Sequence, residues 1–153
     1  MSYICGKSEK MNKVEEAAME YRRTGTLANR NRSVLMQWVR GGIDFQLFQS
    51  MVSKFPFSLE EWSQFLHLSE RTIQRYKKED KNFDSLQSEK ILQISLLYQR
   101  GVEIFGDKEN FNSWLSANNV ALGNVKPKEL LDNAFGMALL DEELTRIEHG
   151  ILA

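Results

Sequence analysis

The chain has 153 residues, of which 42% are hydrophobic and 27% charged, which suits one ordinary domain or two very small ones. Its single cysteine, Cys5, excludes an internal disulfide and fits a reducing compartment. No stretch approaches the roughly 18 consecutive apolar residues of a membrane span, and the N-terminus lacks the apolar core of a signal peptide. We therefore expect a soluble, cytoplasmic protein.

The net charge of -1 hides a gradient along the chain. Residues 1–40 carry 8 Lys or Arg against 4 Asp or Glu, whereas residues 91–153 carry 5 against 9. Because the two ends differ in sign, we expect them to bind different partners.

Apolar residues spaced three and four apart, together with only two prolines, predict an all-α fold. The long helix expected at 84–105 has Asp84 to Gln87 as its start signal and Gly106 as its end signal. The expected helical segments are, in chain order, 11–23, 30–40, Ile43 up to Pro56, two short helices within 57–81, 84–105, 108–117, 127–133 and 137–149.

Residues 57–81 carry the pattern of a helix-turn-helix. Ser58 and Glu61 form a capping box, and Leu59, Trp62 and Leu66 are expected to form the apolar stripe of the first helix. His67 stands where the turn needs a left-handed residue, a conformation in which His is enriched. Ser69 is the N-cap expected for the second helix.

The second helix is predicted to turn Ile73 and Tyr76 inward and a basic stripe outward. Arg and Gln can each bind a base edge through two hydrogen bonds, and Lys supplies charge against phosphate. Such a stripe is often only a solvated face, but the tight turn, the two caps and the absence of acids from 71 to 78 favour DNA binding. The predicted DNA-binding residues are Ser69, Arg71, Thr72, Gln74, Arg75, Lys77 and Lys78. Two copies on adjacent half-sites are expected, with the 11–23 helix as the candidate dimer surface.

The run from Ser69 to Arg75 resembles the helix-turn-helix of Xre-type antitoxins in the Xre/MbcA/ParS group. The motifs that resemble the toxin-binding domain of this group are Phe105-Gly106-Asp107, Trp114-Leu115, Asn118, Leu122-Gly123, Pro127, Leu130-Leu131, Gly136, Leu144-Thr145-Arg146-Ile147 and Gly150. The resemblance covers about residues 41–153. It implies a partner toxin, commonly a RES-domain protein that consumes NAD, which the antitoxin holds inactive while the complex represses its own operon.

Three domains are expected: an N-terminal extension over 1–40, the helix-turn-helix over 41–83 and a toxin-binding domain over 84–153. In the last of these, apolar residues such as Phe111, Leu140 and Leu144 are expected to form a small core. Short polar and glycine residues, and the apolar tail after Gly150, are expected to contact the toxin. The predicted toxin-binding residues are Asn118, Leu122, Gly123, Asn124, His149, Gly150, Ile151, Leu152 and Ala153.

No residue pattern supports catalysis. His67 and His149 are far apart in sequence, and neither a metal-binding motif nor a glycine-rich phosphate loop is present. We expect no catalytic residue, no cofactor and no metal. Two alternatives stay open, a stand-alone helix-turn-helix transcriptional regulator without a toxin partner and a pure interaction adaptor.

Overall fold

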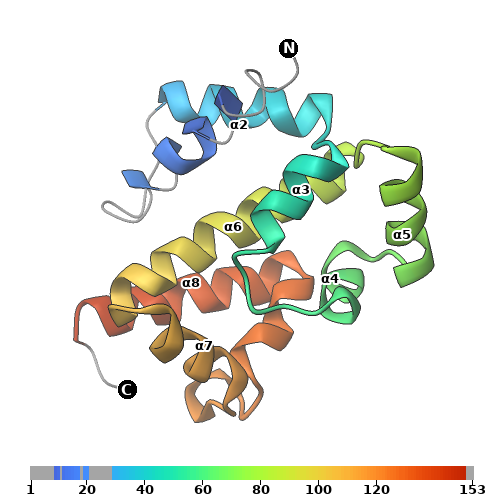
Figure 1. The fold of residues 1–153 in the computed structure, drawn as a ribbon. Coiled ribbons are helices and arrows are strands. Elements are labelled where there is room, and N and C mark those ends of the chain that lie inside the picture. Colours follow the sequence, from blue (N-terminus) through green and yellow to red (C-terminus); the bar gives the residue numbers. More distant parts are fainter. Residues whose placement is uncertain (1–8, 11, 18, 21–28, 151–153) are drawn as a thin grey trace. The chain divides into compact units, whose positions relative to one another are not determined.

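The computed structural model describes residues 9, 10, 12–17, 19, 20 and 29–150. Within these residues the regular elements are helices (Figure 1), accompanied by one isolated bridge between Asn119 and Val125 and no strand, which confirms the all-α prediction. None of the described helices is long and apolar enough to span a membrane. The elements are α2 (Asn29–Gly41), α3 (Phe45–Val52), α4 (Leu59–Leu66), α5 (Glu70–Glu79), α6 (Ser85–Phe105), α7 (Lys108–Ser116), η1 (Val120–Leu122), η2 (Pro127–Asp132) and α8 (Ala134–Glu148).

The chain divides into two compact units, an N-terminal unit of residues 1–100 and a C-terminal unit of residues 101–153. The dividing point lies inside α6, after Arg100. The domain boundary expected from the sequence lies at the start of that helix, at residue 84.

The described part of the chain ahead of α3 is helical at both of its segments. Residues 12–17, 19 and 20 of the helix predicted over 11–23 are helical as predicted, residues 9 and 10 ahead of it are helical too, and 11, 18 and 21–23 lie outside the described residues. The predicted helix at 30–40 is confirmed as α2, which buries Leu35.

The prediction that α3 continues to Pro56 is wrong, because the helix ends at Val52. After Val52 the hydrogen bonds join residues three apart, as in a turn. Lys54 N–H donates to the carbonyl oxygen of Met51 at 3.2 Å, and Phe55 N–H donates to that of Val52 at 3.0 Å. A residue before proline is held out of helical geometry by the proline ring. The chain therefore leaves the helix some residues ahead of Pro56.

Aromatic side chains form the centre of the N-terminal unit. Trp62 is 2% exposed and lies 5.4 Å from Phe48, 5.7 Å from Phe65 and 5.8 Å from Phe57, measured between ring centroids. The Phe48 and Trp62 planes meet at 83°, an edge-to-face geometry that adds about 0.5–1.5 kcal/mol beyond area burial. This cluster fixes α3 against α4.

Ser88 of α6 binds the backbone at the start of the segment that carries α3 to α5. Its buried hydroxyl accepts a hydrogen bond from Ile43 N–H at 2.9 Å, and Phe83 N–H donates to the carbonyl oxygen of Ile43 at 2.9 Å. Residues 43 and 83, which bracket α3 to α5, are thus joined to each other and to α6. The expected start signal is confirmed, because Asp84 accepts from Gln87 N–H at 2.8 Å and the Gln87 side chain accepts from Asp84 N–H at 3.1 Å.

The C-terminal unit is built on capped short helices. Asp107 caps α7, and Asn133 accepts from Gly136 N–H at 2.8 Å to cap α8. Because of that cap, α8 begins at Ala134 and not at the predicted Met137. Its core residues, all at most 1% exposed, are Phe111, Leu115, Leu131, Leu140 and Leu144.

Candidate functional site

The turn between α4 and α5 has the geometry expected from the sequence. Ser58 Oγ accepts from Glu61 N–H at 3.1 Å, and the Glu61 carboxylate accepts from Ser58 N–H at 2.9 Å, so the capping box is complete. His67 ends α4 with φ 55° and ψ 38°, in the left-handed region. Leu68 N–H then donates to the carbonyl oxygen of Ser63 at 3.0 Å, and α5 begins within three residues.

One residue of the apolar stripe predicted for α4 is wrong. Leu59 is 37% exposed, whereas Phe65, which the stripe omitted, is 3% exposed. The inward face of α4 consists of Trp62, Phe65 and Leu66. Helical spacing also permits Leu59 on that face, but it lies in the first turn and the aromatic cluster does not extend to it.

The inward face of α5 is confirmed. Ser69 caps the helix by accepting from Thr72 N–H at 3.1 Å, and its hydroxyl lies 2.8 Å from the Thr72 hydroxyl. Ile73 is 1% and Tyr76 9% exposed. The Tyr76 ring lies 5.4 Å from Phe83, so α5 is held by the same aromatic core as α3.

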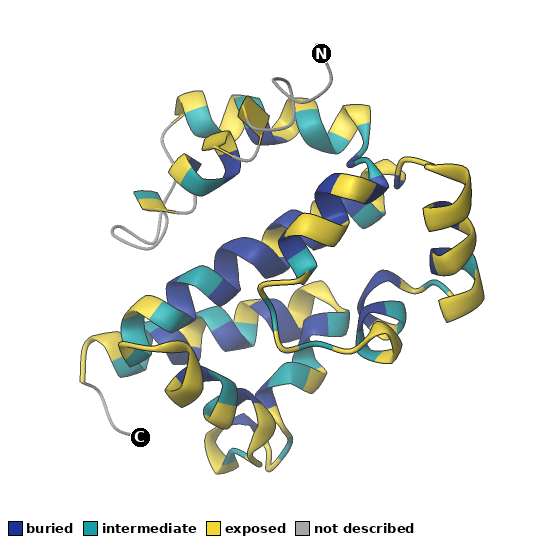
Figure 2. Ribbon diagram, viewed as in Figure 1, coloured by how far each residue is buried: buried dark blue, intermediate teal, exposed yellow. Residues whose placement is uncertain are grey.

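The outward face of α5 is basic and exposed (Figure 2). Exposed side chains at Arg71, Gln74, Arg75, Lys77 and Lys78 cover it, and Thr72 is half-buried. Among the residues that the structure describes, none of the four basic side chains on this face, those of Arg71, Arg75, Lys77 and Lys78, forms an ion pair with a carboxylate. Guanidinium groups in this position can bind guanine O6 and N7, and the ammonium groups can neutralise phosphate. The face is therefore suited to binding nucleic acid. Residues 71–78 include no Asp or Glu that would repel the phosphates.

The predicted loop residues of the C-terminal unit form one tight turn. Asn119 accepts from Ala121 N–H through its side chain at 2.9 Å, and its carbonyl oxygen accepts from Asn124 N–H at 2.8 Å. Gly123 and Asn124 have φ 86° and 62°, so the turn uses two consecutive left-handed residues. Asn118, Gly123 and Asn124 are exposed.

Leu122 does not present its side chain at the surface, because it is only 5% exposed. It anchors the turn, and a direct contact role for its side chain is not compatible with that burial. His149 and Gly150 are exposed, and Gly150 follows α8 with φ 67°. Ile151, Leu152 and Ala153 lie outside the described residues.

Sequence reasoning missed two exposed apolar side chains of the C-terminal unit. Val120 in η1 is 85% exposed and Phe135 in the first turn of α8 is 89% exposed. A reading of α8 from its true N-cap, Asn133, places Phe135 in the first turn, whereas the predicted start at Met137 leaves it in a loop. Exposed aromatic residues of this kind are common at the centres of protein interfaces.

Among the described residues, no group of three or more His, Cys, Asp or Glu side chains could hold a metal ion. His67 serves as the left-handed end of α4, and His149 is the C-cap of α8. Both histidines thus lie at the C-terminal ends of helices.

Comparison with known proteins agrees with this division of the chain. The family model described as "Antitoxin Xre-like helix-turn-helix domain" matches residues 35–95, and the one described as "Antitoxin Xre/MbcA/ParS C-terminal toxin-binding domain" matches residues 100–150. A protein named "Antitoxin Xre" from Yersinia enterocolitica serotype O:8 / biotype 1B is 25% identical over 134 residues, which are 87% of this chain and 90% of that protein. The chain belongs to the Xre/MbcA/ParS antitoxin family, a family of non-enzymatic proteins in which an Xre-like helix-turn-helix precedes a toxin-binding domain.

Proposed function

We propose that this protein is the antitoxin of a type II system, that it neutralises a RES-type, NAD-consuming toxin by direct binding, and that it represses its own operon. One observation supports the proposal above the others: an exposed basic helix, α5, lies in a different compact unit from the toxin-binding domain. A protein with two such surfaces can hold DNA and a protein partner at the same time. The RES identity of the toxin rests on the family resemblance.

The DNA contact is assigned to α5. In this proposal Arg71, Gln74 and Arg75 read base edges in the major groove, and Lys77 and Lys78 neutralise the phosphate backbone. Ser69 and Thr72 lie at the helix N-terminus, where backbone N–H groups favour a phosphate oxygen. A helix of this length reads few base pairs, so we propose a homodimer on two half-sites about 34 Å apart.

The toxin contact is assigned to the exposed loop and the end of the C-terminal unit. Asn118, Gly123 and Asn124 form one part, with Leu122 anchoring them, and His149 and Gly150 lead to the apolar tail Ile151-Leu152-Ala153. Residues 101–150 carry 4 Lys or Arg against 9 Asp or Glu. This charge favours a basic rim on the toxin and a fast association that weakens as salt rises.

The test separates the two contacts. The double variant Arg71→Ala, Arg75→Ala should lose repression and binding to the promoter fragment, because it removes both bidentate base readers. It should still neutralise the toxin in co-expression, measured by growth and by cellular NAD. Arg30→Ala, an exposed basic residue of α2, is the matched control and should retain both properties.

A deletion tests the toxin contact. Removing Ile151 to Ala153 should weaken toxin neutralisation while DNA binding remains. Unchanged neutralisation would refute the role of the tail. If the intact protein binds promoter DNA yet neutralises no product of an adjacent gene, the stand-alone regulator is the better description.

A further inference from the structure

The first turn of α8 exposes an aromatic side chain, that of Phe135. This side chain is 89% exposed, although phenylalanine is among the residues most often buried in folded proteins. A single exposed apolar residue is common on protein surfaces and needs no special explanation. The residues around Phe135 therefore decide whether it belongs to a binding surface.

The backbone on both sides of Phe135 is held in place. The Asn133 side chain accepts from Gly136 N–H at 2.8 Å, and Met137 N–H donates to the carbonyl oxygen of Asn133 at 3.0 Å. Gly136 lies so close to η2 that a Cβ there would meet the carbonyl oxygen of Leu130 at 2.2 Å. Phe135 thus projects from a fixed helix end, and a rigidly presented aromatic side chain loses little conformational entropy on binding.

Helical spacing extends Phe135 into a stripe along α8. Residues 138, 139 and 142 follow it by three, four and seven positions and therefore share its face of the helix. Ala138 and Glu142 are exposed, and Leu139 is half-buried. We call Phe135, Ala138, Leu139 and Glu142 the α8 stripe. The buried residues of α8 lie on its other side and are Gly136, Met137, Leu140, Glu143 and Leu144.

The α8 stripe combines an apolar projection with a charged edge. Phe135 supplies the projection, and the small side chain of Ala138 leaves room beside it for another protein to approach the helix. Glu142 is exposed at the far end of the stripe, next to the half-buried Asp141. A partner that fits this surface has an apolar pocket with a basic group at its rim.

We propose that the α8 stripe is the apolar anchor of the toxin contact, with Phe135 in an apolar pocket of the toxin and Glu142 facing a basic group at the rim. This assignment rests on the proposed function. Two observations favour the toxin as the occupant. The stripe lies within residues 100–150, which match the toxin-binding domain of the family. The same face of α8 ends about two turns after Glu142 at His149, from which the chain leads to the tail assigned to the toxin.

The dissociation constant of the full chain with its toxin tests the anchor. Phe135→Ala should raise this constant about 10-fold or more, because truncating a central aromatic residue removes much of the binding energy of an interface. Phe135→Leu keeps an apolar side chain and should stay within about fivefold of the parent protein. Leu86→Ala is the matched control, since it truncates a 75% exposed leucine of the N-terminal unit, and it should leave the constant unchanged.

Two further variants test the neighbours of Phe135 on the stripe. Ala138→Glu should raise the dissociation constant about 10-fold or more, because a long charged side chain would block the approach of the pocket wall. Glu142→Gln should slow association and reduce its dependence on salt, as expected for a charge at the rim of an interface. An association rate with unchanged salt dependence would contradict the basic group proposed for the toxin.

Other occupants of the α8 stripe give different results. If another part of the chain or a second copy covers it, Phe135→Ala lowers the melting temperature or the sedimentation coefficient of the free protein, and either result overturns the anchor. Promoter binding should be the same for all variants, because α5 contributes nothing to the stripe.

Failure of the anchor and failure of the proposed function are distinguishable. A toxin that binds Phe135→Ala and Ala138→Glu as tightly as the parent protein overturns the anchor and leaves the proposed function intact. A parent protein that neutralises no toxin overturns the proposed function, and the anchor with it.

Discussion

Gly136 of α8 is expected to tolerate no side chain. A Cβ atom placed there would lie 2.2 Å from the carbonyl oxygen of Leu130 and 3.0 Å from its carbonyl carbon and its Cα. The oxygen must retreat from 2.2 Å to at least 3.0 Å, a shift of 0.8 Å in the η2 backbone. Gly136→Ala should therefore destabilise the C-terminal unit.

The magnitude follows from two opposing effects. Overpacking in a closed site costs about 1–3 kcal/mol, and the upper end applies because the obstacle is backbone and not a movable side chain. Alanine stabilises the helix by about 1 kcal/mol relative to glycine, because its helix propensity is higher. The net loss is about 2 kcal/mol, which lowers the melting temperature by roughly 8–16 °C for a domain of this size.

Thermal unfolding followed by circular dichroism measures this loss. Gly41→Ala is the matched control, because a Cβ at Gly41 meets no atom within 4 Å and its φ is not left-handed. That control should melt at or slightly above the parent temperature. If Gly136→Ala melts within about 2 °C of the parent protein, the close approach of α8 to η2 does not constrain the fold as argued.

Three further substitutions, the first with a matched control, test separate parts of the N-terminal unit. Ser88→Ala should destabilise it by about 1–3 kcal/mol in urea unfolding, because the buried N–H of Ile43 loses its acceptor. Ser95→Ala, equally buried, should stay within about 1 kcal/mol, since its hydroxyl only donates to a carbonyl of its own helix; equal losses at the two serines would contradict this. Ser58→Ala should cost about 1 kcal/mol through loss of the capping box, and an unchanged urea midpoint would exclude that role. Lys78→Ala should reduce the salt slope of promoter binding by about one per subunit, and an unchanged slope would place Lys78 away from phosphate.

Local signals were the predictable part of the fold. Ser58, Ser69 and Asp84 all cap helices as expected, and His67 takes the left-handed turn. Each of these features depends on residues within a few positions of one another, so short-range chemistry decides it. The start and end of α6 follow for the same reason.

Assignments of apolar residues to a face were less secure. Leu59 was assigned to the apolar stripe of α4 but is 37% exposed, and Leu86, an apolar residue at the start of α6, is 75% exposed. Spacing defines a stripe on a helix, while burial depends on what packs against that stripe. Near the first turn of a helix the neighbouring elements often end, and both residues lie there.

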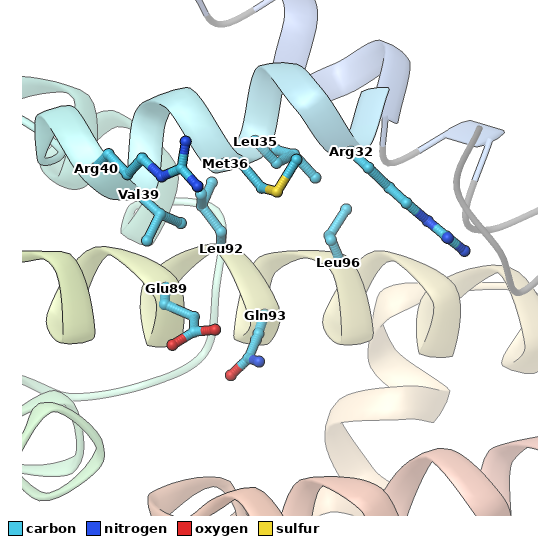
Figure 3. Close-up of a pocket in the computed structure, with 9 residues that line it drawn as sticks. All are labelled: Arg32, Leu35, Met36, Val39, Arg40, Glu89, Leu92, Gln93 and Leu96. Atoms are coloured by element: carbon cyan, nitrogen blue, oxygen red, sulfur yellow. The ribbon is translucent and has the colours of Figure 1, made fainter. Parts of the chain in front are cut away.

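The candidate surfaces also include parts that local sequence predicts and parts that depend on long-range packing. The exposure of Arg71, Gln74 and Arg75 followed from the period of one helix. A hollow between α2 and α6 brings together residues more than 50 positions apart, such as Leu35 and Leu92, and no local pattern encodes that pairing (Figure 3). Phe135 was missed because its exposure depends on where α8 begins.

Two non-glycine residues in left-handed backbone, His67 and Asp80, end α4 and α5. Such a residue carries about 1 kcal/mol of conformational strain that glycine lacks. Evolution has therefore left the helix-turn-helix below the stability its architecture permits. Protein engineers can use these two helix ends to make a more heat-resistant form without redesigning the aromatic core.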